Sequence, residues 1–200
     1  MVRLFLIVLL VWPAFCRAAT APDHQAQSIT RVLFLGNSLI YVNNLPRMLS
    51  ALAASQSEGP HIETATFVAP GGNLAERWDD GHAAEAMRNG AWNVLVLQER
   101  GGLLACMADV DKRQEPECRN SQRAHRQFVE LAKTRRMRVV LLATWGPDAL
   151  WQQKLDRGVR ALARGNDAEV LPAGTVLRAY AATHPQPPLF DAGFHPSLQG

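Results

Sequence analysis

The stretch that decides the fold is Val32-Leu33-Phe34-Leu35-Gly36-Asn37-Ser38-Leu39. An apolar run of strand length ends at Gly36, a residue that allows a sharp turn, and a helical pattern follows. Ser38 is therefore expected at the carboxyl end of a strand and at the start of a helix. Because open α/β proteins bind their ligands at this edge of the sheet, Ser38 is a candidate nucleophile.

Short apolar segments alternate with helical patterns along the rest of the chain. The predicted strands are residues 31–35, 62–68, 93–97, 138–143 and 169–171. The predicted helices are residues 45–54, 74–88, 121–135 and 147–164. Three of the strands are near-continuous apolar runs, as strands buried on both faces are. The alternation predicts an α/β fold with a parallel sheet covered by helices on both faces, formed by residues 28–200 as one domain.

The first 20 residues have the pattern of a secretory signal peptide. Arg3 gives a basic start, residues 4–15 are apolar, and small residues follow. The apolar stretch is interrupted by Pro13 and is shorter than the roughly 20 residues that a membrane span requires. We therefore expect an exported protein, periplasmic or secreted, without a stable membrane anchor. A lipoprotein anchor at Cys16 and an uncleaved membrane anchor are the alternatives.

Export changes the interpretation of the remaining two cysteines. In an oxidising compartment, Cys106 and Cys118 are expected to form a disulfide, which would contribute about 3 kcal/mol by closing a short polar loop. Two free thiols are the alternative. The histidines show no metal-ligand spacing around these cysteines. The net charge of +3 comes partly from the Arg-rich stretch between Lys112 and Arg138. Acidic residues are mixed into this stretch, so a solvated helix face explains it better than a nucleic-acid surface, and no nucleic-acid partner is expected.

The predicted topology gathers polar loops at one edge of the sheet. The loops after the first three strands are residues 36–38, 69–73 and 98–102. The last segment, around His195, is expected to return to the same edge. A serine with a histidine base, a carboxylate on the far ring nitrogen and donors for an oxyanion make an acyl-transfer site. His195 is the candidate base, and either Asp191 or a backbone carbonyl group orients it.

The candidate oxyanion donors are amides from these loops. The backbone amides of Ser38 and Gly72 are two of them, and the side-chain amide of Gln98 or Asn73 is the third. Asn37 is grouped with these substrate-binding candidates, although it is expected to brace the nucleophile turn more than to touch substrate.

In its motifs the chain resembles the SGNH (GDSL-type) hydrolases, in a subgroup whose nucleophile motif reads Gly-Asn-Ser. The motifs occur in order as Gly36-Asn37-Ser38-Leu39, Asn43-Asn44-Leu45-Pro46, Gly71-Gly72-Asn73-Leu74, Val96-Leu97-Gln98-Glu99, Ala143-Thr144-Trp145 and Gly193-Phe194-His195-Pro196-Ser197. The resemblance implies a flavodoxin-like three-layer α/β/α sandwich with a five-stranded sheet. It also implies cofactor-free ester hydrolysis, often of acetylated carbohydrates or lipids, with Ser38 as nucleophile, His195 as base and Gly72 as an oxyanion donor.

The chain departs from the family pattern in three places. Gln98-Glu99 stands where the family has an oxyanion asparagine. Asp191 lies four residues before the histidine, whereas the family's acid lies three before it, at the position of Ala192. The chain ends at Gly200, where relatives continue into a helix. A truncation there would loosen His195.

The sequence therefore predicts an exported serine esterase that prefers small acyl groups such as acetyl, with a small-molecule, glycan or lipid ester as substrate. No metal, nucleotide or flavin is expected. The first alternative is a catalytically weak or inactive relative that binds glycans. A more distant alternative is a module that binds phosphate or flavin at residues 36–38, which would leave the His195 motif unexplained.

Overall fold

A five-stranded parallel sheet forms the centre of the computed structural model, which describes residues 29–191 and 195–197. The strands are β1 (Ile29–Gly36), β2 (His61–Val68), β3 (Val94–Leu97), β4 (Arg138–Leu142) and β5 (Glu169–Leu171). Their order is β2-β1-β3-β4-β5, and every neighbouring pair is parallel. The predicted α/β class and the five strands are confirmed. The predicted signal peptide lies outside the described residues.

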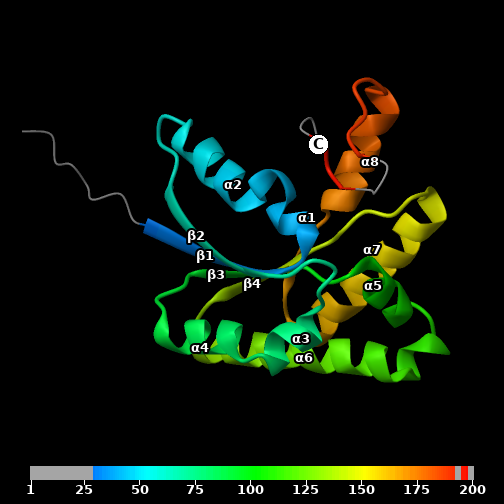
Figure 1. Ribbon diagram of the computed structural model, residues 1–200, viewed down its shortest axis with the longest axis horizontal. Coiled ribbons are helices and arrows are strands. Elements are labelled where there is room, and N and C mark those ends of the chain that lie inside the picture. Colours follow the sequence, from blue (N-terminus) through cyan, green and yellow to red (C-terminus); the bar gives the residue numbers. More distant parts are fainter. Residues whose placement is uncertain (1–28, 192–194, 198–200) are drawn as a thin grey trace, which may run out of the picture.

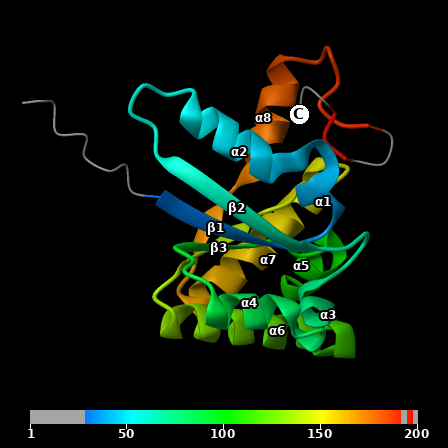
Figure 2. The same ribbon diagram turned by 60° about the vertical axis from the view of Figure 1, so that its left-hand side comes forward.

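Helices cover both faces of the sheet and make three layers (Figure 1). One face carries α1 (Ser38–Tyr41), the 3-10 turn η1 (Val42–Asn44), α2 (Leu45–Ala54) and α8 (Ala173–Thr183). The other carries α3 (Leu74–Asp79), α4 (His82–Asn89), α5 (Gly101–Met107), α6 (Pro116–Thr134) and α7 (Ala149–Asn166), with the 3-10 turn η2 (Lys112–Gln114) before α6. Figure 2 shows α2 and α8 on one side of the strands and α3, α4 and α6 on the other.

The interior strand β1, which lies between β2 and β3, supplies apolar side chains to both layers. Leu33 and Leu35 are buried against the face that carries α3 to α7. Val32 and Phe34 are buried on the opposite face, with Ile40 of α1. Successive side chains of a strand point to opposite faces, so a continuous apolar run is needed where both faces are covered. This explains why the stretch that begins at Val32 has no polar alternation.

Two predicted helices differ from the structure. The helix predicted over residues 74–88 is wrong as a single element, because Gly81 has a left-handed φ of 76° and divides it into α3 and α4. Helix α6 begins at Pro116, five residues before the predicted start. Proline is favoured in the first turn of a helix, where its missing N–H costs nothing. Helices α5 and α8 were not predicted, and α5 opens with two glycines, which favour a loop.

The predicted disulfide is present and joins two helices on the same face of the sheet. Cys106 in α5 and Cys118 in α6 are bonded, with their Cα atoms 6.2 Å apart. Both residues are buried in the larger apolar core. The bond therefore holds the two ends of the polar segment between α5 and α6 against the core.

Among the described residues, no helix has the length and apolarity needed to cross a bilayer.

Removing this disulfide is expected to lower the free energy of unfolding by about 3 kcal/mol, because the closed loop restricts the unfolded chain. The measurement is urea unfolding of the oxidised protein and of a variant with both Cys106→Ser and Cys118→Ser. Dithiothreitol should destabilise the parent by a similar amount and leave the double variant unchanged. Equal stability of the two oxidised proteins would contradict the prediction.

Candidate active site

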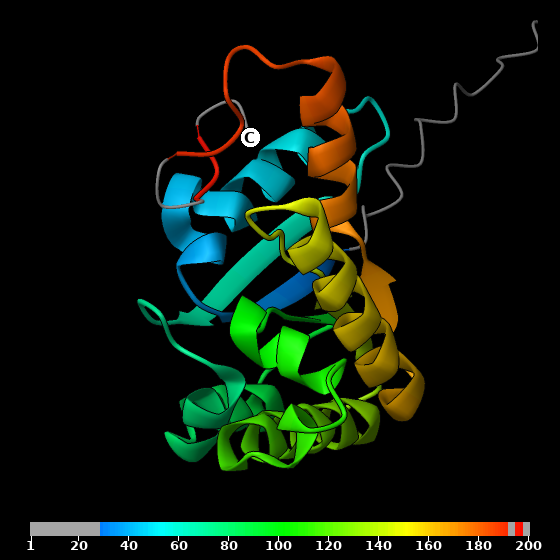
Figure 3. The ribbon, with the colours of Figure 1, turned by 90° about the vertical axis from the view of Figure 1, so that its right-hand side faces the viewer.

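The structure brings Ser38 and His195 into hydrogen-bond contact. The His195 Nε2 atom lies 2.9 Å from the Ser38 Oγ atom, although 157 positions separate the residues in sequence. Ser38 is the first residue of α1, and one residue, Asn37, separates it from the end of strand β1. His195 belongs to the C-terminal segment, which lies beside the α1–α2 region in Figure 3. This distance is within the range that allows a histidine to take a proton from a serine hydroxyl.

Asn37 braces the turn that carries Ser38. Its side chain is almost fully buried, with 4% exposed. Its N–H donates to Gln98 Oε1 at 2.9 Å, and its Nδ2 donates to the Gly72 carbonyl at 3.1 Å. Its Oδ1 accepts from the Leu39 N–H and so caps α1. These contacts agree with the expected bracing role of Asn37, and its substrate-binding role stays a prediction.

Gln98 is not placed to donate to an oxyanion. It is fully buried, its Oε1 accepts from the Asn37 N–H, and its Nε2 donates to the Glu99 carbonyl at 2.8 Å. This geometry gives the Gln98 amide a bracing role, and the prediction of Gln98 as oxyanion donor stays a prediction. The same arrangement explains Gly36, since a Cβ atom there would collide with the Gln98 Oε1 and carbonyl oxygens. Close approach, and not a left-handed turn, requires the glycine.

The loop between β2 and α3 holds Gly72 and Asn73. The Gly72 N–H donates to the Ala69 carbonyl at 3.1 Å, so it could serve an oxyanion only by sharing that turn bond. Its role as a donor stays a prediction. Asn73 caps α3 by a capping box: its Oδ1 accepts from the Glu76 N–H at 3.0 Å, and its Nδ2 donates to Glu76 Oε1 at 2.8 Å. Asn73 therefore caps α3 in this geometry, and its oxyanion role stays a prediction.

Asp191 contacts the main chain of His195 more closely than its ring. The Asp191 Oδ1 atom accepts from the His195 N–H at 2.9 Å, and the Asp191 N–H donates to the His195 carbonyl at 2.9 Å. The same Oδ1 lies 4.0 Å from the His195 Nδ1 atom, beyond hydrogen-bond distance. The carboxylate can therefore attract a protonated ring, but in this geometry it shapes the loop and does not fix the tautomer directly.

Sequence reasoning missed one residue of the site. The Asn43 Nδ2 atom donates to the carbonyl oxygens of Pro196 at 2.6 Å and Ser197 at 3.0 Å. These are the two residues that follow His195. The resemblance included Asn43 in a motif, but nothing in the sequence indicated a partner so far along the chain.

Comparison with known proteins gives structural neighbours only, since neither a family model nor a curated protein matches the sequence. One neighbour is a protein from Slackia heliotrinireducens provisionally assigned to the SGNH hydrolases, with 23% identity, a TM-score of 0.65, and coverage of 85% of this chain and 91% of that one. The chain has the SGNH-hydrolase fold.

Two esterases with solved structures share this fold. A catalytic mutant of Axe2, an acetylxylan esterase from Geobacillus stearothermophilus, is 14% identical at a TM-score of 0.59, over 84% of this chain and 87% of that one. AlinE4, an SGNH-hydrolase family esterase, is 17% identical at a TM-score of 0.55, over 82% of this chain and 84% of that one. The Gly-Asn-Ser subgroup stays a prediction.

Within the SGNH-hydrolase fold, this chain has a buried acid next to Gln98. The Glu99 side chain is 1% exposed. Its Oε1 accepts from the Arg100 N–H at 2.7 Å, and its Oε2 accepts from the Ser121 hydroxyl at 2.6 Å and, more weakly, from the Leu74 N–H at 3.4 Å. The carboxylate therefore joins the starts of α3 and α5 to α6. These contacts give Glu99 a bracing role.

His125 of α6 lies close to this acid and is also buried. Its Nδ1 atom is 2.8 Å from the Ser121 carbonyl oxygen. Burial lowers the pKa of the His125 imidazole below its usual 6.5, and the charge of Glu99 and the bond to Ser121 offset the effect only in part. The folded protein therefore favours the neutral ring.

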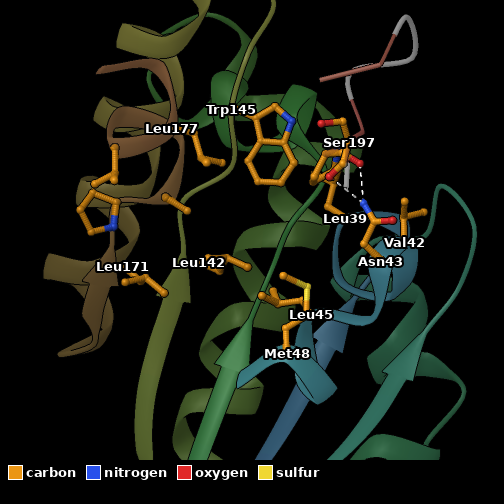
Figure 4. A pocket seen from close by; sticks show the side chains of 14 residues that line it. Leu39, Val42, Asn43, Leu45, Met48, Leu142, Trp145, Leu171, Leu177 and Ser197 are labelled. Atoms are coloured by element: carbon orange, nitrogen blue, oxygen red, sulfur yellow. Dashed lines mark hydrogen bonds between the residues drawn. The ribbon is translucent and has the colours of Figure 1, made fainter. Parts of the chain in front are cut away.

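An apolar groove of about 570 Å³ lies beside the Ser38–His195 pair (Figure 4). Met48 of α2 and Leu177 of α8 line it from the two helices, with Leu142 and Trp145 also among its walls. Leu39, next to Ser38, and Pro196 and Ser197, next to His195, line it as well. The groove therefore adjoins both members of the pair.

In the described part of the chain, no three or more His, Cys, Asp or Glu residues are grouped as a metal site would require.

Acidification is expected to destabilise the protein through His125. The unfolded chain binds the proton more readily than the folded one, so the free energy of unfolding decreases as pH falls below about 6.5. Urea unfolding at pH 7.5 and pH 5.5 measures this decrease. It should be smaller in His125→Gln and unchanged in His82→Gln, which alters an exposed histidine. An equal decrease in His125→Gln and the parent would contradict the assignment.

Proposed function

We propose that this protein is an exported serine esterase that hydrolyses carboxylic esters and prefers small acyl groups such as acetyl. The observation that carries the proposal is the 2.9 Å contact between Ser38 Oγ and His195 Nε2 at the carboxyl edge of the sheet. The esterases among the structural neighbours support the same reaction type. Export is inferred from the signal-peptide pattern of residues 1–20.

Acylation begins when the Ser38 hydroxyl attacks the ester carbonyl carbon. His195 Nε2 takes the hydroxyl proton as the C–O bond forms, and a tetrahedral intermediate results. When the intermediate collapses, the imidazolium gives the proton to the leaving alkoxide. A water molecule then attacks the acyl-enzyme, with His195 again as base, and releases the acid and free Ser38. The cycle consumes one water and needs no cofactor.

The negative charge of the tetrahedral intermediate requires N–H donors. The Ser38 N–H lies at the first position of α1, where a helix provides no intrahelical acceptor. It is the first donor in this proposal. The Gly72 N–H is the second, if it shares its bond to the Ala69 carbonyl with the oxyanion. The Asp191 carboxylate lies 4.0 Å from the His195 ring and accepts from the His195 main-chain N–H, so its part in this proposal is to hold the loop that carries the base.

The preferred substrate is an acetylated glycan or a lipid ester outside the cytoplasm. The acetylxylan esterase among the structural neighbours supports a small acyl group on a carbohydrate. A second candidate is an esterase for longer acyl chains, because the apolar groove adjoins Leu39 and Pro196. The chain-length dependence of hydrolysis distinguishes the two candidates.

The first test is hydrolysis of p-nitrophenyl acetate, butyrate and octanoate by the purified protein and by Ser38→Ala. The parent should hydrolyse all three, acetate fastest, and Ser38→Ala should lose at least about 10³-fold in kcat, because no other group replaces the nucleophile. Equal rates in the two proteins would exclude Ser38. No turnover by folded parent would favour the glycan-binding alternative, and faster octanoate hydrolysis would favour the longer acyl chain.

A comparison of Asp191→Asn with Asp191→Ala tests how the acid acts. Because its oxygen accepts from the His195 N–H, the asparagine variant should keep that bond and retain kcat within about tenfold, while alanine should lose more. The measurement is kcat for acetate hydrolysis, with circular dichroism to verify folding. A loss of about 10⁴-fold in Asp191→Asn would instead mean that the carboxylate fixes the ring tautomer.

A further inference from the structure

We infer that Asn43 is a positioning residue for the catalytic base: its carboxamide holds the His195 segment against the helix that carries Ser38. The inference rests on the proposed function in its claim that His195 acts as base. The contact itself, from Asn43 Nδ2 to the Pro196 and Ser197 carbonyl oxygens, is independent of it.

Asn43 lies where the chain leaves the nucleophile helix. Helix α1 ends at Tyr41, and Asn43 follows in η1 with φ 61° and ψ 9°, a left-handed conformation. Asparagine adopts this conformation more readily than other residues with a side chain. From this position one Nδ2 atom donates to two successive carbonyl oxygens, and Figure 4 shows both bonds.

Four further hydrogen bonds of the His195 segment join residues within it, and the Phe190 ring contacts Trp145 after β4 with the ring centroids 5.6 Å apart. Asp191 and His195 exchange main-chain and carboxylate bonds, and the Ser197 N–H and hydroxyl donate to the Leu189 and Pro188 carbonyls. These bonds lie within residues 188–197, so they set the form of the segment but not its distance from Ser38. The Asn43 amide joins the segment to the α1–η1 region, 153 positions earlier in the sequence. Among these contacts it is the one that joins the segment to the nucleophile helix, so it acts directly on the separation of base and nucleophile.

That separation has direct chemical weight. Proton transfer requires the Ser38 Oγ and His195 Nε2 atoms to stay within about 2.6–3.2 Å, and a misplacement of 1 Å can cost about 10²-fold in rate. The His195 side chain is 32% exposed, so tight packing does not hold it in place. Its main chain must therefore be held, and Asn43 binds that main chain directly after the histidine.

Asn44 provides a matched control. It also has a left-handed conformation, with φ 54°, but its side chain accepts from the Arg47 N–H at 3.3 Å and caps α2. Glycine adopts this conformation without strain, so Asn43→Gly and Asn44→Gly each remove a carboxamide and keep the backbone path. A difference between them in catalysis then reports on the contact to the His195 segment.

The kinetic test compares the parent, Asn43→Gly, Asn43→Asp and Asn44→Gly on p-nitrophenyl acetate. Both Asn43 variants should lose about 10- to 100-fold in kcat with KM within about twofold, because substrate contacts remain and the base is displaced. The aspartate has the size of asparagine but no donor for the two carbonyls. Asn44→Gly should stay within about twofold of the parent. Rates are divided by the fraction of sites that a fluorophosphonate labels at completion, which removes any effect of unfolded protein.

Similar kcat values in Asn43→Gly and Asn44→Gly would overturn the inference. So would a loss in the Asn43 variants that disappears when the rates are divided by the labelled fraction, since this would mean a purely structural role.

A second measurement does not depend on activity. Amide hydrogen exchange of the Asp191 and Ser197 N–H groups, followed by NMR, should be faster in Asn43→Gly than in the parent and Asn44→Gly. If the parent hydrolyses no ester but this difference is observed, the proposed function fails and the positioning contact stands. Unchanged exchange in Asn43→Gly would overturn the contact, whether or not the parent is active.

Discussion

The hydrogen bond from the Asn37 N–H to Gln98 Oε1 is the constraint on which the site depends. It crosses from the turn after β1 to the end of β3, and it is buried. Gly36 has no side chain, which lets Gln98 approach the turn closely enough for the bond. The side-chain Nδ2 atom of Asn37 donates to the Gly72 carbonyl. One buried contact thus fixes the nucleophile turn relative to two neighbouring loops.

The polar network continues from Gln98 into the layer of helices that contains α3, α5 and α6. Gln98 donates to the Glu99 carbonyl, and the Glu99 carboxylate collects bonds from Leu74, Arg100 and Ser121. Buried polar groups are costly unless each has a partner, so such a network is stable only when complete. This accounts for the many protein contacts of the Gln98 side-chain amide, which lies behind the turn that carries Ser38. The polar atoms of Gln98 and Glu99 form hydrogen bonds that fix the positions of the loops at this edge of the sheet.

The strands could be predicted from the sequence because a short continuous apolar run such as Val32–Leu35 is typical of a strand that is buried on both faces. Parallel topology places the loops that follow the strands at one edge of the sheet, which located Ser38, and the return of the His195 segment to this edge was a separate expectation that the structure meets. The capping role of Asn73 has a local signal, because Asn73 and Glu76 have capping-box spacing. The burial of Gln98 and the reach of Asn43 depend on contacts between distant segments, which no local pattern encodes.

The two hydrogen bonds from Asn43 to the His195 segment have an evolutionary consequence. Its partners are the backbone carbonyl oxygens of residues 196 and 197, a feature that every amino acid supplies. The side chains of these two residues also line the apolar groove beside the active site. Substitutions of Pro196 and Ser197 can therefore change the shape of the groove and keep the hydrogen bonds from Asn43. Selection for another groove shape would act on their side chains, and selection for the position of His195 would act on their main chain.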